Sequence, residues 1–573
     1  MASSGNFTKW SPLFKDTNLA SLKEACTRFD GTTNATSALT DFAIPVGTKF
    51  YAEVIAKLGS NYYNIFGIAP PDLNLATYAR NLANVYGIEQ RTNPGAYTIN
   101  SISNTTVGSD SSSQGDLDTQ VLTYGIAVNR VDNEVKLYLD NTLKFTLSIP
   151  STGEFHFMCS FTGGNNATSV HYNFNGGHDS TGAGDKTAAS NTDENGFGEF
   201  QYSPPSGHLA CCSANLPTSS DIDPGGDNGA DENPTKQFGV LTYSGGTSGI
   251  TGLGFQPDLV WIKRRSDAQS NGLFDSSRGT SKVLNSDGNS AEATSSGLTS
   301  FDSDGYTMGT FYNQSSYTYV SWCWKANGGT TASNGSGSIT STVQANTKAG
   351  FSIVTYTGND GSWGSGNRDT FGHGLSAAPE LIFIKETNSV DQWTVFHAHV
   401  GNGGGSNAAA NNLVLNTSAA LYTNQSYKSF GETMPTSTLV TVEGNTTNSS
   451  SSNHVAYCWH SVDGYSKFGS FEGNSNNDGP FIYTGFRPRL LFIKNIDSSS
   501  PWGVYDGERP GFNDCDLGAW DESTALDNNI GAYPLDILSN GFKLKTSNAT
   551  VNSSHTWVYG AWADVPAKYN NAF

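Results

Sequence analysis

Over the first 217 residues, apolar and polar positions alternate with the two-residue period of a β-strand. Gly, Asn, Asp and Ser separate these short runs, as turns separate the strands of a β-sandwich. Asp140 and Asn141 lie between two runs and are residue types that favour a tight hairpin turn. We therefore predict a β-sandwich over residues 1–217, with strands at 49–55, 63–69, 124–128, 135–139, 144–149, 155–159 and 170–174.

A different pattern begins after residue 237, where apolar side chains occupy consecutive positions. A motif with proline, leucine, two apolar residues and a final isoleucine–lysine pair occurs three times, in Gly254–Lys263, Leu375–Lys385 and Gly485–Lys494. Such runs predict strands that are buried on both faces. Each proline is expected where a strand begins, because its missing N–H costs least there.

The same region contains a second threefold repetition, which is rich in aromatic residues. Tyr319–Trp324, His454–Trp459 and Trp557–Trp562 alternate more clearly and predict half-buried strands that close each repeat. The prolines at 257, 379 and 488 recur every ~110–120 residues, which suits a small domain and is too long for a solenoid. We predict an all-β protein, in which the sandwich is followed by three tandem β-sandwich-like repeat domains at 237–329, 350–467 and 468–573.

Two segments do not follow these patterns. Residues 218–236 are rich in Gly, Pro and acidic residues and are expected to be a linker. A calcium site on Asp221, Asp223, Asp227 and Asp231 is the alternative, although their spacing fits no EF-hand. In the sandwich, the apolar residues at 75, 78, 79, 82, 85 and 86 follow helical spacing and predict a short helix.

Composition excludes several classes of protein. The formal net charge of −20 disfavours binding to nucleic acid or to an anionic membrane surface. No run reaches the 18 or so apolar residues of a membrane helix, and no secretion signal is recognisable, so we expect synthesis in a cytosol and no membrane insertion. The 12% of aromatic residues recur at fixed places in the repeats, which favours packed cores over disorder.

Two resemblances follow from these motifs. Residues 45–175, with the successive segments 66–69, 125–128 and 137–141, resemble a SPRY or concanavalin-like lectin sandwich of the jelly-roll type. The repeats resemble uncharacterised repeats in tail and fibre proteins of marine bacteriophages, where they often follow a SPRY-like domain. The resemblance implies a virion protein exposed on the particle, a tail fibre or receptor-binding adhesin that forms a homotrimer and contacts other virion proteins. It implies no catalytic residues.

A search for chemistry identifies few candidates. His373, His397 and His399 lie in one repeat but lack a clear fourth zinc ligand, so no metal site is expected. Asp302 with Asp304, or Asp506 with Glu508, offers the paired carboxylates that glycoside hydrolysis needs. The first pair also suits a simple turn. We expect no enzyme and no cofactor, with a surface polysaccharide depolymerase as an alternative.

Binding of glycans is easier to motivate, because sugar rings stack on aromatic faces while amides and carboxylates bond their hydroxyls. Aromatic and polar residues adjoin at four places in the repeats. We predict binding of host cell-surface polysaccharide there; the alternative is a head-fibre, decoration or tail-body protein without a receptor role. The candidate residues are Trp363, Asn367 and Arg368; Tyr312 and Asn313; Tyr422; and Trp520 and Asp521.

Overall fold

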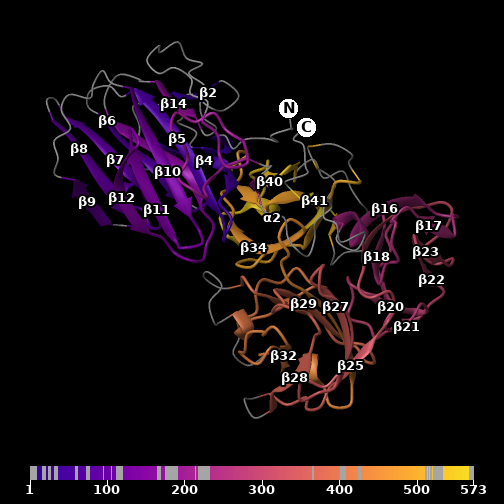
Figure 1. Ribbon diagram of the computed structural model, residues 1–573. Helices are drawn as coiled ribbons and strands as arrows, with labels where there is room; N and C mark the ends of the chain where they lie inside the picture. The colour runs from indigo at the N-terminus through magenta and orange to yellow at the C-terminus, as the bar shows by residue number, and fades with distance from the viewer. Residues whose placement is uncertain are drawn as a thin grey trace. The chain divides into compact units, whose positions relative to one another are not determined.

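The computed structural model of the chain divides into two compact units, Met1–Pro217 and Thr218–Phe573. Both consist of β-strands with a few single helical turns, which confirms the all-β prediction (Figure 1). The first boundary coincides with the predicted end of the sandwich. The structure describes residues 10–15, 21–23, 28–30, 36–57, 62–71, 78–93, 96–104, 106–110, 121–163, 169–173, 191–212, 215–216, 233–363, 367–400, 408–423, 428–509, 513, 515, 519–520 and 533–566.

The N-terminal unit is a sandwich of two large antiparallel sheets. The first sheet has the order β1-β4-β13-β6-β7-β8-β9. Its strands are Trp10–Lys15, Thr36–Ala43, His156–Gly163, Tyr62–Ala69, Tyr86–Asn93, Ala96–Ser103 and Thr106–Asp110. The second has the order β12-β11-β10-β5-β14-β3-β2, and β15 pairs with β5. These strands are Thr142–Ser148, Glu134–Leu139, Val121–Asn129, Lys49–Lys57, Ser169–Asn173, Arg28–Asp30, Ser21–Lys23 and, for β15, Leu209–Ala210.

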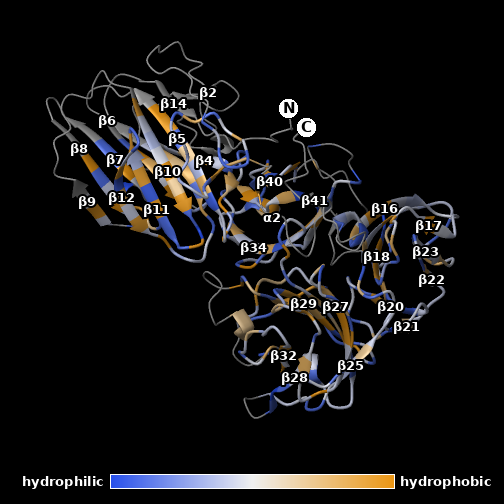
Figure 2. Ribbon diagram, in the orientation of Figure 1, coloured by the Kyte–Doolittle hydropathy of each residue, from blue (hydrophilic) through white to orange (hydrophobic). Residues whose placement is uncertain are grey.

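One core fills the space between these two sheets, and the predicted alternation explains it. Along β11 every second residue is buried, and orange and blue positions alternate on the strands of this unit in Figure 2. Phe66 and Tyr124, from opposite sheets, have ring centroids 4.6 Å apart in this core. All seven predicted strands are present.

The turn predictions had mixed outcomes. Asp140 and Asn141 have φ of 42° and 64°, the left-handed conformation that a tight β-hairpin between β11 and β12 requires. The predicted helix is wrong over the part that is described. Only a 3-10 turn forms, η1 (Ala79–Asn81), and β7 begins at Tyr86. Asn84, at a positive φ of 58°, turns the chain between the two.

Each repeat of the second unit pairs a large sheet with a small one. In the first repeat, preceded by η4 (Pro234–Lys236), the large sheet is β16-β24-β18-β19-β20-β21 and the small sheet is β17-β23-β22. The large sheet comprises Phe238–Ser244, Thr318–Trp324, Leu259–Arg264, Gly272–Asp275, Lys282–Asn285 and Ala293–Thr294. The small sheet comprises Gly249–Thr251, Gly305–Met308 and Leu298–Asp302.

The large sheet of the second repeat has the order β25-β26-β27-β33-β29-β30-β31, in which β25 and β26 are two additional strands at one edge. Its small sheet is β28-β32. Those of the large sheet are Ala332–Asn334, Ser341–Asn346, Phe351–Thr357, Asn453–Trp459, Leu381–Glu386, Thr394–His397 and Leu413–Val414. Those of the small sheet are Asp369–Gly372 and Leu439–Val442. Its helical turns are η6 (Ala408–Ala410) and α1 (Asn445–Asn448).

The third repeat has the large sheet β34-β41-β36-β37-β38 and the small sheet β35-β40-β39. The strands are Ser466–Glu472, Thr556–Pro566, Phe486–Asn495, Gly503–Asp506 and Ala519–Trp520, then Phe481–Tyr483, Gly541–Leu544 and Leu535–Leu538. The turn α2 spans Ala549–Asn552.

The proline motif forms strands buried on both faces, as predicted. All six residues of β18 and all six of β29 are buried. Pro257 and Pro379 precede their strands, and Pro488 lies at an irregularity in the register of β36 with β41. The lysine of each motif is buried too. Lys263 Nζ donates to Asn271 Oδ1 at 3.1 Å and Lys494 Nζ to the Ser418 carbonyl at 3.0 Å, so these lysines tie down the neighbouring loops.

The closing strands are not half-buried, and that prediction was wrong. Six of the seven residues in β24 and in β33 are buried. In β24, Tyr319 and Cys323 face the first repeat's own core, whereas Trp322 and Trp324 face a core that extends through all three repeats. Each closing strand is therefore an interior strand of its sheet, covered on one face by its own repeat and on the other by the two other repeats.

Three tryptophans occupy the middle of this shared core. Trp324, Trp459 and Trp562 are the last residues of the three predicted closing segments, and each contacts both others in T-shaped geometry. Their ring centroids lie 5.5 Å apart for Trp324–Trp562 and 6.0 Å for the other two pairs. Such edge-to-face pairs are a preferred aromatic arrangement.

Polar contacts close the three repeats into a ring around these tryptophans. The residue that ends β19, β30 or β37 always bonds the closing strand of the next repeat. Tyr457 OH donates to Asp275 Oδ2 at 2.7 Å, Trp322 Nε1 donates to Asp506 Oδ2 at 3.0 Å, and His397 Nε2 is 3.1 Å from the Tyr559 carbonyl. The repeats are thus arranged cyclically, first to second, second to third and third to first.

The three tandem repeats predicted from the sequence share one core. Residues Thr218–Phe573 form one compact unit, and one apolar cluster draws residues from Phe238 to Trp562. The physical reason is that each large sheet has two apolar faces, and its own small sheet covers only one. The structure also assigns residues 332–346, outside all predicted domains, to strands β25 and β26 of the second repeat.

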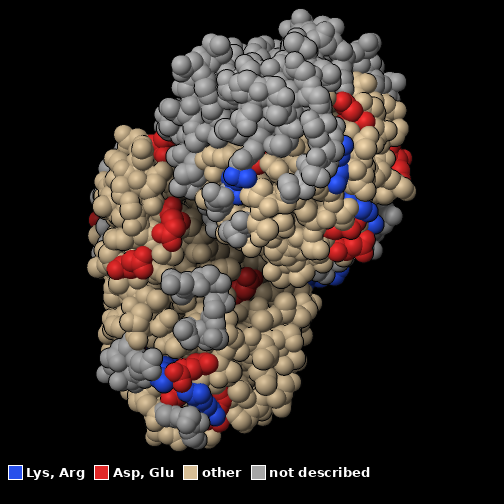
Figure 3. All heavy atoms as spheres, turned by 90° about the vertical axis from the view of Figure 1, so that its left-hand side faces the viewer, with Lys and Arg blue, Asp and Glu red and all other residues tan. Residues whose placement is uncertain are grey.

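The surface carries few charged groups. Figure 3 shows small groups of acidic and basic side chains among mostly uncharged atoms on the face in view, in keeping with the 14% of charged residues. In the described residues, no helix is long and apolar enough to cross a membrane.

Candidate functional site

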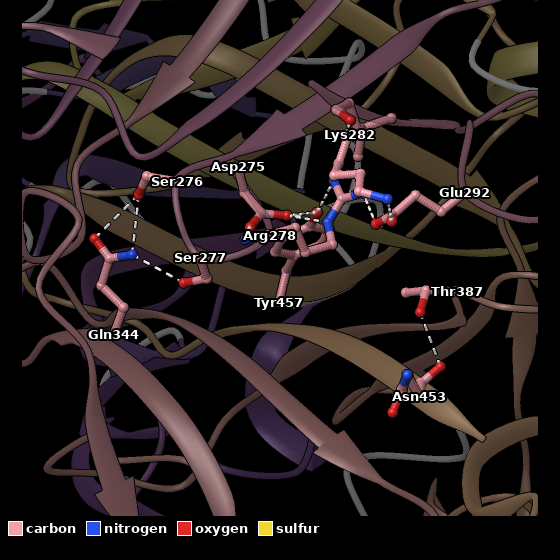
Figure 4. A network of polar contacts seen from close by, with 11 residues as sticks. Asp275, Ser276, Ser277, Arg278, Lys282, Glu292, Gln344, Thr387, Asn453 and Tyr457 are labelled. Atoms are coloured by element: carbon pink, nitrogen blue, oxygen red, sulfur yellow. Dashed lines mark hydrogen bonds and ion pairs between the residues drawn. The ribbon is translucent and has the colours of Figure 1, made fainter. Parts of the chain in front are cut away.

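A polar cleft of about 340 Å³ lies between the first and second repeats. The first repeat contributes the stretch after β19 and the segment around β21, and the second contributes β26, β27, β33 and the loop after β29. The lining residues are Ser277, Arg278, Glu292, Thr340, Thr342, Thr355, Tyr356, Thr357, Thr387, Asn453 and His454. Figure 4 shows the polar contacts around it.

The floor of the cleft is part of one face of the second repeat's large sheet. Thr342 pairs with Thr355 across β26 and β27, and Thr357 pairs with Asn453 across β27 and β33. Because side chains two apart share a face, Gln344 and Tyr457 lie on this same face, farther along their strands. Those two contact the first repeat, so one half of the face is an interface and the other half stays open.

The wall from the first repeat is built around Arg278. Its Nε bonds Asp275 Oδ2, Nη1 bonds Glu292 Oε2 at 3.0 Å, and Nη2 bonds Tyr457 OH at 3.3 Å. Burial acts to lower the pKa of Arg278, but the charge of Asp275 and the other acceptors raises it overall. Lys282 Nζ is 3.1 Å from Glu292 Oε1, so Glu292 also bonds two cations (Figure 4).

Further hydrogen bonds hold wall and floor together. Gln344 Nε2 donates to the hydroxyls of Ser276 and Ser277, both at 2.9 Å. The Glu292 N–H donates to the Thr387 carbonyl at 2.7 Å, and Thr387 Oγ1 donates to the Asn453 carbonyl at 3.1 Å. The cleft is therefore preformed by contacts between the two repeats.

His454 follows Asn453 in β33, so its side chain lies on the face of the sheet opposite the threonine floor and is only 1% exposed. Its ring stacks on Tyr356 with centroids 4.9 Å apart, and its Nδ1 lies 3.1 Å from the Ser452 carbonyl, which requires the proton to be on Nδ1. Nε2 is buried without a hydrogen-bond partner. Burial lowers the pKa of His454 to about 4, so the ring is neutral at pH 7.

The arrangement suits binding better than covalent chemistry. Its two acidic neighbours, Asp275 and Glu292, are each bonded to Arg278, so neither is placed as a free general base. Among the residues described, no group of three or more His, Cys, Asp or Glu side chains could hold a metal ion. What the cleft does offer is a row of hydroxyl groups on a rigid sheet.

Three of the predicted glycan-binding residues lie together in the second repeat. Asn367 Nδ2 is 3.5 Å from the Trp363 carbonyl, and the Trp363 ring lies close to Gly444, where an added Cβ would fall 2.4 Å from it. Arg368 is committed to ion pairs with Glu443 at 2.8 Å and Glu432 at 2.9 Å. Trp363 is half-buried, so this group is compact but its cation is already paired.

The remaining predicted residues do not join that group. Tyr312 was wrongly predicted as a surface residue: it is 1% exposed, packs on Gly272 and Phe274, and accepts a hydrogen bond from Asn285 at 3.2 Å. Asn313 Oδ1 accepts the Gly246 N–H at 2.9 Å and so holds a turn. Tyr422 is 40% exposed. For Trp520 only the backbone pairing with Gly503 is described, and Asp521 lies outside the described residues.

The catalytic and metal candidates have structural roles where they are described. His373 and His397 are buried and bond the carbonyls of Thr436 and Tyr559, both at 3.1 Å. Asp302 accepts the Thr307 hydroxyl at 2.7 Å and Asp304 bonds the backbone at Gly254, as expected for a turn. Asp506 bonds Trp322 and Arg509. Glu508 pairs with Arg489, and the four aspartates of the linker lie outside the described residues.

Sequence reasoning missed the cleft. The available signal was threonine at alternate positions, 340 and 342 and then 355 and 357, which places hydroxyls on one face of two strands. The sequence did not indicate that the first repeat leaves this part of the sheet face uncovered.

Comparison with known proteins identifies the second unit. The family described as "Domain of unknown function (DUF7483)" matches residues 233–566. The chain belongs to this family. The match runs from Asn233, the residue before η4, to the end of β41, so the DUF7483 region contains all three repeats, in keeping with their shared core.

Solved structures with similar folds include the PSpry domain of TRIM65, the SPRY domain of human HERC1 and a β-glucanase of Bacillus licheniformis. Their identities are 9%, 13% and 13%, and their TM-scores 0.22, 0.23 and 0.21. The matches cover 29%, 28% and 29% of this chain and 91%, 96% and 89% of the respective structures. No curated protein matches the chain.

Proposed function

We propose that this chain is a structural protein of a bacteriophage virion, a tail fibre or adhesin that recognises host-surface glycans without cleaving them. The viral setting is supported by the resemblance of the repeat motifs to phage tail and fibre proteins. The binding role is supported by the described part of the DUF7483 region, where a polar cleft offers threonine hydroxyls and its Arg278 and Glu292 side chains are bonded to each other.

The observation that carries the proposal is the open half of the second repeat's sheet. The hydroxyls of Thr340, Thr342 and Thr355 form no hydrogen bond among the described residues, although the face beside them is fully engaged with the first repeat. Hydroxyl groups that line a rigid concave site are suited to bind a ligand rich in hydroxyls.

A second candidate function is a head-fibre, decoration or tail-body protein without a receptor role. The observation that favours it is that side chains predicted to bind glycans instead hold the fold: Tyr312 is in a core, Asn313 holds a turn and Arg368 is paired twice. Under either function we propose a homotrimer as the assembled form.

The deciding experiment is binding of the full-length purified chain, fluorescently labelled, to a panel of marine bacterial isolates and to polysaccharide extracted from each. Saturable binding that the same polysaccharide competes away is expected for the adhesin. Absence of binding to every isolate would favour the second candidate. Loss of polysaccharide viscosity during the incubation would contradict a non-cleaving role and indicate a depolymerase.

A further inference from the structure

We propose that the cleft between the first and second repeats binds an uncharged, polyhydroxylated saccharide through hydrogen bonds from the threonine floor. This inference rests on the proposed glycan-binding function and names the chemical class of the ligand and the residues that select it.

The charge balance of the cleft argues for a neutral ligand. The cations Arg278 and Lys282 are matched by the carboxylates of Asp275 and Glu292, and every one of these four groups is bonded to another. An acidic sugar would find no unpaired cation, and an amino sugar would find no unpaired carboxylate. Bringing a charged group into a site without a partner costs several times more than bringing a hydroxyl.

The free hydrogen-bonding groups point to hydroxyls on the ligand. The hydroxyls of Thr340, Thr342 and Thr355 have no partner in the part of the chain that is described, and each can both donate and accept. Asn453 Oδ1 accepts the Thr357 hydroxyl at 3.1 Å, which leaves the Nδ2 donors of that amide available. A sugar hydroxyl also donates and accepts, so it can satisfy such a row in several orientations.

The site is particular to the second repeat. Strand β27 is matched by β16 in the first repeat and by β34 in the third, and in those repeats the matching strand is the edge of the large sheet. Only in the second are β25 and β26 added beyond it, and β26 and the residue before it supply Thr342 and Thr340. These two additional strands extend the floor of the cleft beyond the part of the sheet that the first repeat covers.

The dimensions and contacts predict weak binding of a short saccharide segment. The volume of about 340 Å³ lies at the lower end of ligand sites, which span roughly 300–1,000 Å³. Tyr356 lies between Thr355 and Thr357, so its side chain is on the opposite face of the sheet, where its hydroxyl bonds the Thr447 carbonyl at 2.6 Å and its ring stacks on His454. Each hydrogen bond to a neutral ligand adds little net affinity, so useful affinity would come from many copies of the chain on one particle.

The test compares the full-length chain with the double variant Thr342→Val/Thr355→Val. Valine keeps the β-branched shape that suits a strand and removes only the hydroxyls. The matched control is Thr251→Val, at an exposed position of β17 outside the cleft. The probes are dextran, mannan, galactan and laminarin as neutral polysaccharides and alginate and chondroitin sulfate as acidic ones, with the bacterial isolates included. Thermal unfolding confirms that all variants fold.

We expect the wild type to bind at least one neutral polysaccharide, the double variant to lose at least tenfold in affinity, and Thr251→Val to bind as the wild type does. Binding of acidic polysaccharides alone, or binding of any probe or isolate that the double variant retains, would overturn the inference while leaving the proposed function standing. Absence of all binding, to probes and isolates alike, would overturn the proposed function and the inference together.

Discussion

The N-terminal sandwich and the three-repeat unit bury apolar strand faces in different ways. In the sandwich, two large sheets cover each other, and strands such as β11 bury every second side chain. In the repeats, strands such as β18 bury every side chain, because one face meets the repeat's own small sheet and the other meets the neighbouring repeats. Strands with alternating apolar residues therefore indicate two sheets that cover each other. Strands with only buried residues indicate a sheet that must pack against other structures on both faces.

The same difference places the candidate site. A closed ring of three repeats has interfaces between the repeats. At the interface between the first and second repeats, the first repeat covers only part of one face of the second repeat's large sheet. The cleft is the uncovered remainder. A repeat that did not pack against its neighbours would have no cleft of this kind.

The largest expected effect comes from separating the repeats. We expect residues 218–573 to fold alone, and residues 237–329 alone to fail to fold, because Trp261, Trp322 and Trp324 would lose the partners that cover them. Near-ultraviolet circular dichroism and a cooperative thermal transition provide the measurement. Residues 1–217 serve as the control and should fold. A cooperative transition from the isolated repeat would contradict the shared-core description.

Next is truncation of a central tryptophan. Trp459→Ala should cost about 3–5 kcal/mol, as expected for removal of a large buried aromatic side chain. Because Trp459 contacts Trp324 and Trp562, amide hydrogen exchange should rise in all three repeats. The matched change in the sandwich is Phe66→Ala, which should raise exchange only within residues 1–217. Exchange confined to the second repeat in Trp459→Ala would break the comparison.

The second repeat should also make the molecule sensitive to acid. Burial lowers the pKa of His397 to about 3 and that of His373 to about 4, from an ordinary value of 6.5. Below about pH 6.5 these histidines therefore bind protons in the unfolded chain but not in the folded chain. Their contribution to the free energy of unfolding is complete above about pH 6.5 and is lost as the pH falls toward 4. Each histidine should account for about 3 kcal/mol of this loss, because one pKa unit corresponds to about 1.4 kcal/mol.

The control for that prediction is His397→Gln, which keeps an amide donor near the Tyr559 carbonyl but does not titrate. Denaturant unfolding between pH 7 and pH 4 should give a shallower loss of stability for the variant, whatever its stability at pH 7. An unchanged slope would show that His397 is not the neutral, buried group that the structure places there.

The smallest effect is expected for one contact of the polar ring. Tyr457→Phe removes the hydroxyl between Asp275 and Arg278 and should cost about 1.5–3 kcal/mol, the range for hydrogen bonds to charged groups. Tyr422→Phe, at an exposed position, should change stability by less than about 0.5 kcal/mol. Denaturant unfolding measures both. Equal effects would mean that the contact between the first two repeats contributes little.

Much of the local structure was predictable because it depends on neighbouring residues. The strands of the sandwich, the turn at Asp140 and Asn141 and the doubly buried proline strands all follow from periodicity and turn preference. The positions of the candidate binding residues were harder to predict. Phe311 and Tyr312 are adjacent aromatics, yet Phe311 is 48% exposed and Tyr312 is 1% exposed, and the sequence does not say which one turns inward.

By itself, the sequence determined an all-β chain, a boundary near residue 217 and three copies of one framework, because strand periodicity, turn chemistry and repetition are properties of short segments. Only the tertiary structure decided that the copies close around Trp324, Trp459 and Trp562, and that β26 extends beyond the first repeat to leave a threonine-lined cleft. The reason is that an apolar face in a sequence shows that burial is required, but the partner that provides it is chosen by contacts between residues more than a hundred positions apart.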